Sequence, residues 1–284
     1  MNSGNDGRVP RTGPTKTANP GATPPQEFAT ALRNWLVIMG FLVREQLKAA
    51  RGKAGRAGLL IAIAEPFALI LMFYMIRGLI RGTVQDYGTS LFLFLASGLL
   101  PYYLFLRTSI VTRRGRAGPG PRLPRINSLD TFMAAVATQA LIWIPVIAIV
   151  FLGMVMYGIQ EARPASIATC AYALFLMLTL GAGFGLVNLS IGRFISAWPI
   201  IIGMTTRGML FLSGVIHIPD FLYPSVREWL AWNPLLHGVT LFRLGVYGEY
   251  PTLLFDEGYL LKCTLVFVFV GLVVDRATLR FESR

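Results

Sequence analysis

Residues 59–76 read LLIAIAEPFALILMFYMI, an apolar run that contains a single charged residue, Glu65, followed by Pro66. A helix needs about 20 predominantly apolar residues to cross the hydrocarbon core of a bilayer, and this run is close to that length. A carboxylate inside such a segment is costly and is usually kept for a function. The stretch therefore predicts a membrane-spanning helix that carries a functional glutamate.

The composition agrees with an integral membrane protein. Of the 284 residues, 54% are hydrophobic and only 14% are charged, and the mean hydropathy is +0.58. About a quarter of the residues of a soluble domain are charged. Cys170 and Cys263 both lie in apolar stretches, which favours packing between helices over a disulfide, and no metal-type Cys/His spacing is present. The sequence also lacks a phosphate-binding G-x-x-x-x-G-K-[ST] motif, so no ATPase activity and no bound cofactor or metal is expected for this chain.

The net charge of +12 is distributed unevenly along the chain. Nine lysines and arginines precede the first predicted span, and six more lie between the second and the third. Basic loops stay on the cytoplasmic side of a membrane. The N-terminus, the loop 107–125 and the C-terminal tail are therefore predicted to be cytoplasmic, and we attribute most of these charges to contact with anionic headgroups rather than nucleic acid.

Three regions follow one another. Residues 1–25 are rich in Gly, Pro, Thr and Asn, which predicts a disordered cytoplasmic tail, and they do not have the pattern of a secretory signal. Residues 26–56 carry apolar side chains at a spacing of three to four, which predicts an amphipathic helix in the cytoplasmic membrane interface. A short core helix of a soluble domain is the alternative. Residues 57–284 predict a six-span transmembrane domain.

The fold class is therefore an all-α membrane protein. Six segments are long enough for tilted spanning helices, namely about 59–79, 90–110, 131–157, 165–192, 195–216 and 259–275. The segment 217–250 is broken by Pro219, Pro224 and Pro234, but it is rich in aromatic residues. It predicts short re-entrant helices at the outer membrane face, and an ordinary folded outer loop is the alternative.

Short stretches of residues 40–284 recur in an order that is typical of a known family. They are Arg44-Glu45, Glu65-Pro66, SGLLP (97–101) followed by Arg107, Leu129-Asp130-Thr131, Leu212-Ser213-Gly214, NPLLHG (233–238), LFR (241–243) and GVYG (245–248). As an ordered set they resemble the membrane subunit of type-2 ABC exporters, and more narrowly the capsule polysaccharide export permeases of Gram-negative bacteria. Departures from the family pattern are found at Ile61, Ala135, Gln139 and Thr240.

The resemblance implies a multi-pass permease of the bacterial inner membrane that moves a lipid-linked polysaccharide and has no catalytic residues. It also implies a homodimer that joins two copies of a separate ATPase subunit, which holds ATP and Mg, and acts with periplasmic and outer-membrane export proteins. The departures leave an O-antigen-like glycan open as the cargo. Two further alternatives are another type-2 ABC permease for a lipid or drug, and a non-ABC membrane enzyme or channel.

Candidate path residues follow from the chemistry of a sugar chain. Sugar faces pack on aromatic rings, so the predicted substrate path comprises Tyr102, Tyr103, Phe105, Trp143, Trp198, Glu65 and Arg207. For the aromatic residues the alternative is a lipid-facing belt or plain helix packing. An arginine within a span should face the bundle interior or a water-filled path. There Arg207 either binds an anionic sugar or a carrier phosphate, or pairs with Glu65 to hold helices together.

Two further sets complete the candidate residues. The resemblance places an ATPase-coupling helix in the loop 107–130, where the residues expected to make the contact are Arg113, Arg114, Leu123, Pro124, Ile126 and Asp130. A loop that binds headgroups is the alternative. In the outer re-entrant segment the candidates are Trp229, Trp232, Asn233, Pro234, His237 and Arg243.

Overall fold

The computed structural model describes residues 24–51, 56–81, 87–115 and 128–282, and within these ranges the chain is helical and contains no β-strand. The order of the elements is α1 (Pro24–Arg51), α2 (Arg56–Arg81), α3 (Leu91–Gly115), α4 (Ser128–Met156), the 3-10 turn η1 (Gln160–Ala162), α5 (Ile167–Phe194), α6 (Trp198–Leu212), the 3-10 turn η2 (Pro219–Phe221), α7 (Pro224–Leu230), α8 (Pro234–Tyr247) and α9 (Glu257–Glu282). The all-α class is confirmed. The predicted tail, residues 1–25, lies almost entirely outside the described residues.

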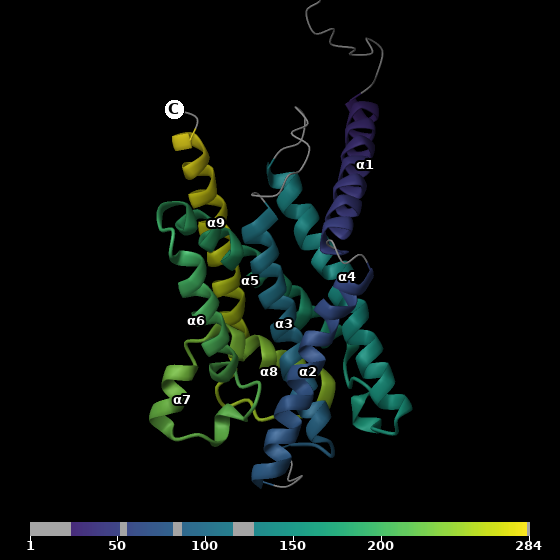
Figure 1. Ribbon diagram of the computed structural model, residues 1–284, viewed down its shortest axis with the longest axis vertical. Helices are drawn as coiled ribbons and strands as arrows, with labels where there is room; N and C mark the ends of the chain where they lie inside the picture. Colours follow the sequence, from purple (N-terminus) through teal and green to yellow (C-terminus); the bar gives the residue numbers. More distant parts are fainter. Residues whose placement is uncertain (1–23, 52–55, 82–86, 116–127, 283–284) are drawn as a thin grey trace, which may run out of the picture.

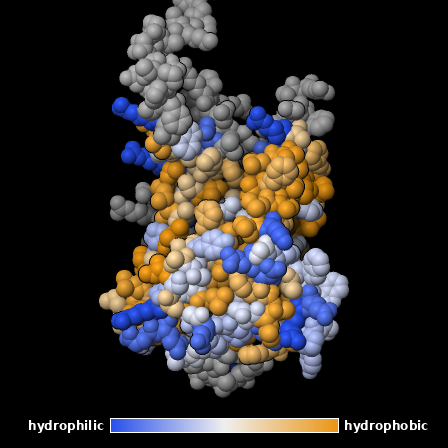
Figure 2. Space-filling view, turned by 180° about the vertical axis from the view of Figure 1, so that it is seen from behind, coloured by the Kyte–Doolittle hydropathy of each residue, from blue (hydrophilic) through white to orange (hydrophobic). Residues whose placement is uncertain are grey.

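Four of the described helices, α3, α4, α5 and α9, are long and apolar enough to cross a bilayer. Figure 2 shows one face of the molecule, on which hydrophobic side chains cover much of the upper half and hydrophobic and hydrophilic side chains are mixed in the lower half. Helix α2 has 26 residues and covers the first predicted span. Helix α6 has only 15 residues, about 22 Å at 1.5 Å per residue, and is shorter than the predicted segment 195–216. It begins next to Pro199 and ends before Gly214, whose φ of 68° cannot continue a right-handed helix.

Helices α3 and α5 form the centre of the bundle. In the apolar stretch of α3, 83% of the residues are buried, against 17% in α9, which lies at the periphery. Figure 1 shows α6 and α9 on one side of this centre and α1, α2 and α4 on the other. Because α3 is apolar around its whole circumference, it can only be stable as an interior helix.

Glycines allow the central helices to approach each other closely. A Cβ atom at Gly183 of α5 would lie 2.6 Å from the backbone nitrogen of Val268 in α9, and one at Gly181 would lie 2.6 Å from the carbonyl oxygen of Phe105 in α3. Helix pairs in membranes associate largely through such small-residue contacts, since burial of apolar surface gains little in hydrocarbon. The glycines of α5 therefore set its distance to both neighbours.

Arg243 connects several segments at the end of the bundle where α8 lies. This side chain of α8 is 1% exposed, and its guanidinium donates to the carbonyl oxygens of Gly214 (2.7 Å), Val215 (2.8 Å) and Phe94 (3.1 Å) and to the hydroxyl of Tyr250 (2.8 Å). It also lies 3.9 Å from the centroid of the Phe94 ring. Neutral acceptors thus pair with both terminal nitrogens of a buried cation, whereas its Nε has no partner, and this one side chain joins α8 to α3 and to the turn after α6.

The segment 217–250 forms η2, α7 and α8, three short elements that each begin with a proline. Proline suits the first helical position because the amide it lacks would be unpaired there. Helix α8 is buried along most of its length against α3, α5 and α9. The short helices that the sequence predicts are present, and their re-entrant position in the membrane stays a prediction.

Helix α1 lies beside the beginning of α4, where the indole Nε1 of Trp35 donates to Oδ1 of Asp130 at 3.2 Å. Figure 1 shows α1 running along α4 rather than across the bundle. That α1 lies in the membrane interface stays a prediction.

The close contact at Gly183 predicts the effect of adding one methyl group. Gly183→Ala places a Cβ against the backbone of α9, so we expect it to destabilise the folded protein by about 1–3 kcal/mol through overpacking. The measurement is the midpoint of thermal unfolding of the purified protein in detergent. Gly153→Ala in α4 is the matched control, because its Cβ would meet nothing within 4 Å. Equal midpoints for both variants would contradict the proposed packing.

Candidate functional site

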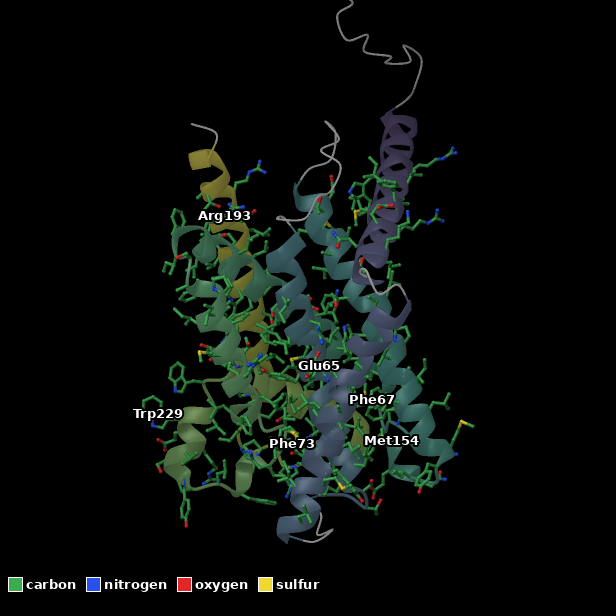
Figure 3. The ribbon with its side chains drawn as sticks, in the orientation of Figure 1. Glu65, Phe67, Phe73, Met154, Arg193 and Trp229 are labelled. Carbon is green, nitrogen blue, oxygen red and sulfur yellow. The ribbon has the colours of Figure 1, made fainter. Side chains whose placement is uncertain are left out.

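A cavity that is lined by polar and apolar residues in equal number, and that we call the polar cavity, opens between α2, α3, α5 and α6. Its volume is about 240 Å³, and its polar lining residues are Glu65, Ser109, Asn188, Thr206 and Arg207. Figure 3 places Glu65 near the middle of the height of the bundle, far from either end. The structure therefore brings the glutamate of the first predicted span and the arginine of the fifth to one cavity.

Glu65 is held by two residues of α3. Its carboxylate forms an ion pair with the guanidinium of Arg107, and its Oε1 accepts a hydrogen bond from the Tyr103 hydroxyl at 3.3 Å. The guanidinium of Arg107 also lies 5.9 Å from the centroid of the Tyr103 ring. Because the two charges neutralise each other, a carboxylate at this depth becomes tolerable. About half of the Glu65 side chain, 53%, remains exposed to the cavity side.

Arg207 does not form the ion pair with Glu65 that the sequence analysis gives as one of its two alternatives. Arg107, not Arg207, takes the carboxylate of Glu65. Arg207 is exposed on α6, and among the described residues no hydrogen bond or ion pair to its guanidinium is found. An unpaired guanidinium cannot face hydrocarbon without a large cost. That α6 spans the membrane stays a prediction, and in that position Arg207 would require polar surroundings.

Trp198 does not line this cavity but is hydrogen-bonded to Asn188 of α5, which does. Its indole Nε1 donates to Oδ1 of Asn188 at 2.9 Å, and Nδ2 of Asn188 donates to the carbonyl oxygen of Phe184 at 2.7 Å. Asn188, Ser109 and Thr206 are not among the residues that the sequence predicts for the path. The sequence contained a signal for Asn188, because it is the only amide side chain in the mainly apolar helix α5.

The other aromatic candidates lie deeper. Tyr102, Tyr103, Phe105 and Trp143 are at most 3% exposed. Tyr102 donates its hydroxyl to the carbonyl oxygen of Thr206, and the rings of Tyr103 and Trp143 are 6.0 Å apart. In a single chain these rings fill the space behind the cavity, as in the packing alternative. That they line a substrate path stays a prediction.

The candidate coupling residues are only partly described. Leu123, Pro124 and Ile126 lie outside the described residues. Arg113 and Arg114 belong to the last turn of α3, where the backbone alone is described. Asp130 lies in the first turn of α4, where a negative charge favours the helix dipole, and accepts the hydrogen bond from Trp35. The only coupling candidate with a described side chain therefore contacts α1.

The outer-segment candidates divide into exposed and buried residues. Trp229 and Trp232 are 81% and 74% exposed, and Figure 3 shows Trp229 at the edge of the molecule. Asn233 caps α8, which Pro234 begins: its Oδ1 accepts from the amide of Leu235 at 3.1 Å. Two exposed indoles thus lie close to the start of α8, which is capped by the side chain of Asn233.

His237 is buried, like Arg243, and its ring is hydrogen-bonded to the backbone on both sides. Asp256 donates its amide to Nδ1 of His237 at 3.0 Å, so Nε2 carries the proton and donates to the carbonyl oxygen of Ala231 at 2.8 Å. Both ring nitrogens are thereby occupied, and the ring joins α8 to the start of α9. Among the described residues no group of three or more His, Cys, Asp or Glu could hold a metal ion.

The chain has homologues among proteins of capsule polysaccharide export. It is 28% identical over 228 residues to the polysialic acid transport protein KpsM of Escherichia coli, an alignment that covers 78% of this chain and 86% of that protein. It is 25% identical over 252 residues to the capsule polysaccharide export inner-membrane protein CtrC of Neisseria meningitidis serogroup B, which covers 84% and 89% of the two chains. A shorter match, 28% over 102 residues, is to BexB of Haemophilus influenzae, covering 36% and 38%. No protein-family model matches the chain.

The ion pair at the cavity generates a double-mutant prediction. Arg107→Met leaves the Glu65 carboxylate without its partner, so we expect it to destabilise the protein by roughly 1–3 kcal/mol. Adding Glu65→Gln removes the orphaned charge and should restore most of that loss. The measurement is the amount of monodisperse protein recovered by size-exclusion chromatography. If the double variant were recovered no better than Arg107→Met alone, the two side chains would not act as a pair.

Proposed function

We propose that this chain is the permease subunit of an exporter that moves capsule polysaccharide across the inner membrane. The observation that carries the proposal is homology to KpsM and CtrC over most of both chains. The apolar helices agree with a multi-pass membrane protein. Since these relatives are transport and export proteins of the membrane, a transport role without chemistry of its own is the best supported one.

The physical problem of this transport is the desolvation of the cargo. A polysaccharide carries many hydroxyl groups, and each costs several kcal/mol when it enters hydrocarbon without a hydrogen-bond partner. A protein-lined path supplies such partners. The cavity around Glu65, Asn188 and Arg207 offers carboxylate, amide and guanidinium groups midway along the bundle, and we propose that it forms part of the wall of this path.

A homodimer would place the path between two chains. The exposed face of α6 combines Arg207 with apolar side chains, and α2 contacts α6 through Phe73 and Phe211, whose ring centroids are 6.2 Å apart. A second copy packed on this face would remove Arg207 from lipid and close the half-open cavity on its exposed side. The need of Arg207 for polar surroundings supports this arrangement.

The charge of Arg207 suggests what part of the cargo it contacts. A guanidinium presents a planar fork of donors that matches a carboxylate or phosphate. One of the relatives takes its name from polysialic acid, an acidic glycan. We propose that Arg207 contacts an anionic sugar or the phosphate of a lipid carrier as the chain passes.

The proposed topology has six spans, formed by α2, α3, α4, α5, α6 and α9, with both termini in the cytoplasm. Figure 1 shows the start of α1 and the end of α9 at the same end of the bundle, and the excess of arginine and lysine favours the cytoplasm for that end. Helices α7 and α8 then lie at the outer face as re-entrant elements. Exposed tryptophans on and beside α7 suit the depth of the membrane boundary.

The energy for the proposed transport comes from outside this chain. Two ATPase subunits that hold ATP and Mg dock at the basic loop 107–130 and rotate α3 and α4 as rigid bodies. The hydrogen bond from Trp35 to Asp130 would carry α1 along with this movement. Periplasmic and outer-membrane proteins would receive the glycan.

The proposed function predicts where the glycan accumulates. Deleting the gene should leave polysaccharide in the cytoplasm and remove it from the cell surface, as measured by fractionation and immunoblotting with glycan-specific antibodies. Re-expressing Arg207→Leu should lower surface glycan at least about tenfold relative to the native chain, because a charge-assisted contact worth about 1.5–3 kcal/mol is lost. Arg207→Lys keeps the charge and should retain part of the export.

Three outcomes would separate the parts of this proposal. A full surface coat in the deletion strain would rule out glycan export as the function. Normal export by Arg207→Leu would leave export standing but exclude Arg207 as a cargo contact. Loss of the membrane protein itself in Arg207→Leu, seen on an immunoblot of the membrane fraction, would instead point to a structural role at the dimer interface.

The docking site predicts a second result. Reversing the charge of both Arg113 and Arg114 to glutamate should lower ATPase co-purification by about tenfold, while the permease remains in the membrane, because two favourable contacts become repulsive. The measurement is the ratio of the two subunits after affinity purification. Arg276→Glu, at the exposed cytoplasmic end of α9, is the control. An unchanged ratio in the double reversal would leave the loop as a headgroup-binding segment.

A further inference from the structure

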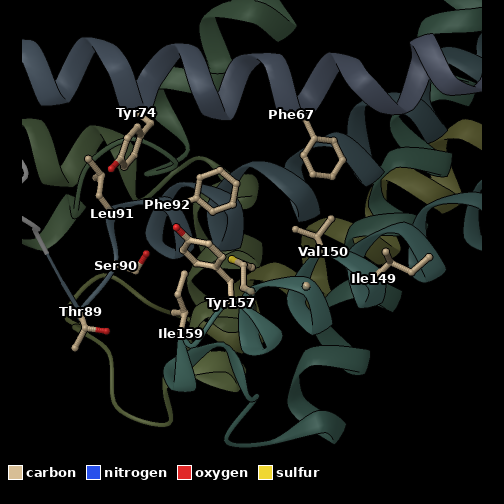
Figure 4. Close-up of a pocket in the computed structure, with 12 residues that line it drawn as sticks. Phe67, Tyr74, Thr89, Ser90, Leu91, Phe92, Ile149, Val150, Tyr157 and Ile159 are labelled. Carbon is tan, nitrogen blue, oxygen red and sulfur yellow. The ribbon is translucent and has the colours of Figure 1, made fainter.

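A second cavity lies on the other side of α2 and has no role in the proposed path. Its volume is about 640 Å³, and it is enclosed by α2, the start of α3 and the last turns of α4, as Figure 4 shows. Its walls are mostly apolar: Phe67 of α2, Leu91 and Phe92 of α3, and Val150 and Met154 of α4. A volume of several hundred Å³ with apolar walls is typical of a ligand site.

The cavity is elongated along the bundle and has one polar end. From Phe67 to Tyr74 on α2 is about 10 Å, and from Ile149 on α4 to Tyr157, the residue that follows this helix, about 12 Å, at 1.5 Å per residue. Four lining residues carry a hydroxyl group, namely Tyr74, Thr89, Ser90 and Tyr157. The last three lie where α3 begins and α4 ends, and Figure 4 shows Thr89 and Ser90 beside each other away from Phe67 and Val150. The lining thus changes from apolar to polar along its length, as an amphiphile does.

Its mouth faces the bilayer rather than the proposed second copy. Two of the lining residues, Ile149 of α4 and Tyr157 directly after this helix, are 68% and 87% exposed. Glu65 and Phe67 are two residues apart on α2 and therefore about 200° apart around the helix. The polar cavity and its proposed dimer partner lie on the Glu65 side, so this cavity opens on the opposite side.

We propose that this cavity binds an acyl chain of a bilayer phospholipid, with its headgroup at the hydroxyl-lined end. In the orientation proposed above, this is a lipid of the outer leaflet. An empty apolar void forfeits dispersion contacts along its whole lining, and water finds few partners there. A hydrocarbon chain restores those contacts, while the hydroxyls of Thr89, Ser90 and Tyr157 donate to ester or phosphate oxygens. The site does not depend on the nature of the exported cargo.

Gly153 provides a means to fill the cavity without disturbing the fold. It lines the cavity, and a Cβ placed on it meets nothing within 4 Å. Gly153→Phe therefore extends a ring into the space proposed for the acyl chain. Leu152→Phe is the matched control, because Leu152 is the neighbouring residue, is 60% exposed and does not line the cavity.

The experiment uses the full chain in nanodiscs of phosphatidylethanolamine and phosphatidylglycerol that contain a small share of phosphatidylcholine with a diazirine in its acyl chain. After photolysis, mass spectrometry locates the lipid adducts. We expect the native chain to be labelled chiefly at the lining residues of α3 and α4. Labelling there should fall about tenfold in Gly153→Phe, because a tenfold loss of affinity corresponds to about two acyl-chain methylenes that no longer fit into the cavity. Labelling should persist in Leu152→Phe.

Three results would overturn the site. Equal labelling of Gly153→Phe and the native chain would show that the cavity is not where the lipid binds. Labels spread evenly over outward residues such as Leu141 and Leu152 would indicate bulk lipid contact only. A disulfide between two chains carrying Gly153→Cys would show that a second copy occupies the cavity. If Gly153→Phe is not recovered as folded protein, Ile149→Phe at the mouth tests the same closure.

Discussion

Every polar group in this protein that lies at membrane depth needs a partner, because hydrocarbon offers none. The helical backbone meets this requirement internally, and two charged side chains meet it in different ways. Glu65 is neutralised by Arg107 on the next helix, and the two terminal nitrogens of the Arg243 guanidinium donate to carbonyl oxygens and a hydroxyl. Arg207 has no such partner among the described residues, and we propose that a second copy of the chain supplies its polar surroundings.

Helix α2 separates two environments. The side that carries Glu65 adjoins a polar cavity next to α6, and the side that carries Phe67 adjoins a larger apolar cavity next to α4. A helix with a polar cavity on one side and an apolar one on the other can serve a hydrophilic path without exposing it to lipid. The same helix would then hold a lipid chain against the outer half of the bundle. The division rests on a spacing of two residues, which reverses the direction of side chains on a helix.

The end of the bundle where α8 lies, which we propose to be the outer one, is held by polar contacts within a mainly apolar region. Arg243, His237 and Asn233 join α8 to the end of α6 and to the start of α9. Short elements that begin with proline would otherwise leave carbonyl and amide groups unpaired close to the membrane. The sequence marks these three residues as candidates of an outer segment, and their contacts show that they hold that segment together.

The amino-acid sequence is enough to predict that the protein is all-helical, where the long apolar helices lie, and which charges fall within them. These properties depend on the local cost of polar groups in hydrocarbon, which hydropathy and residue type express directly. The packed bundle was needed to learn that Arg107 rather than Arg207 pairs with Glu65, that Asn188 reaches the cavity, and that Tyr102 lies in the interior. Those outcomes depend on the rotation of each helix about its axis and on the approach of its neighbours. Both are set by packing at residues such as Gly181 and Gly183. Because glycine has no side chain, a hydropathy pattern does not show which neighbouring helix it will contact.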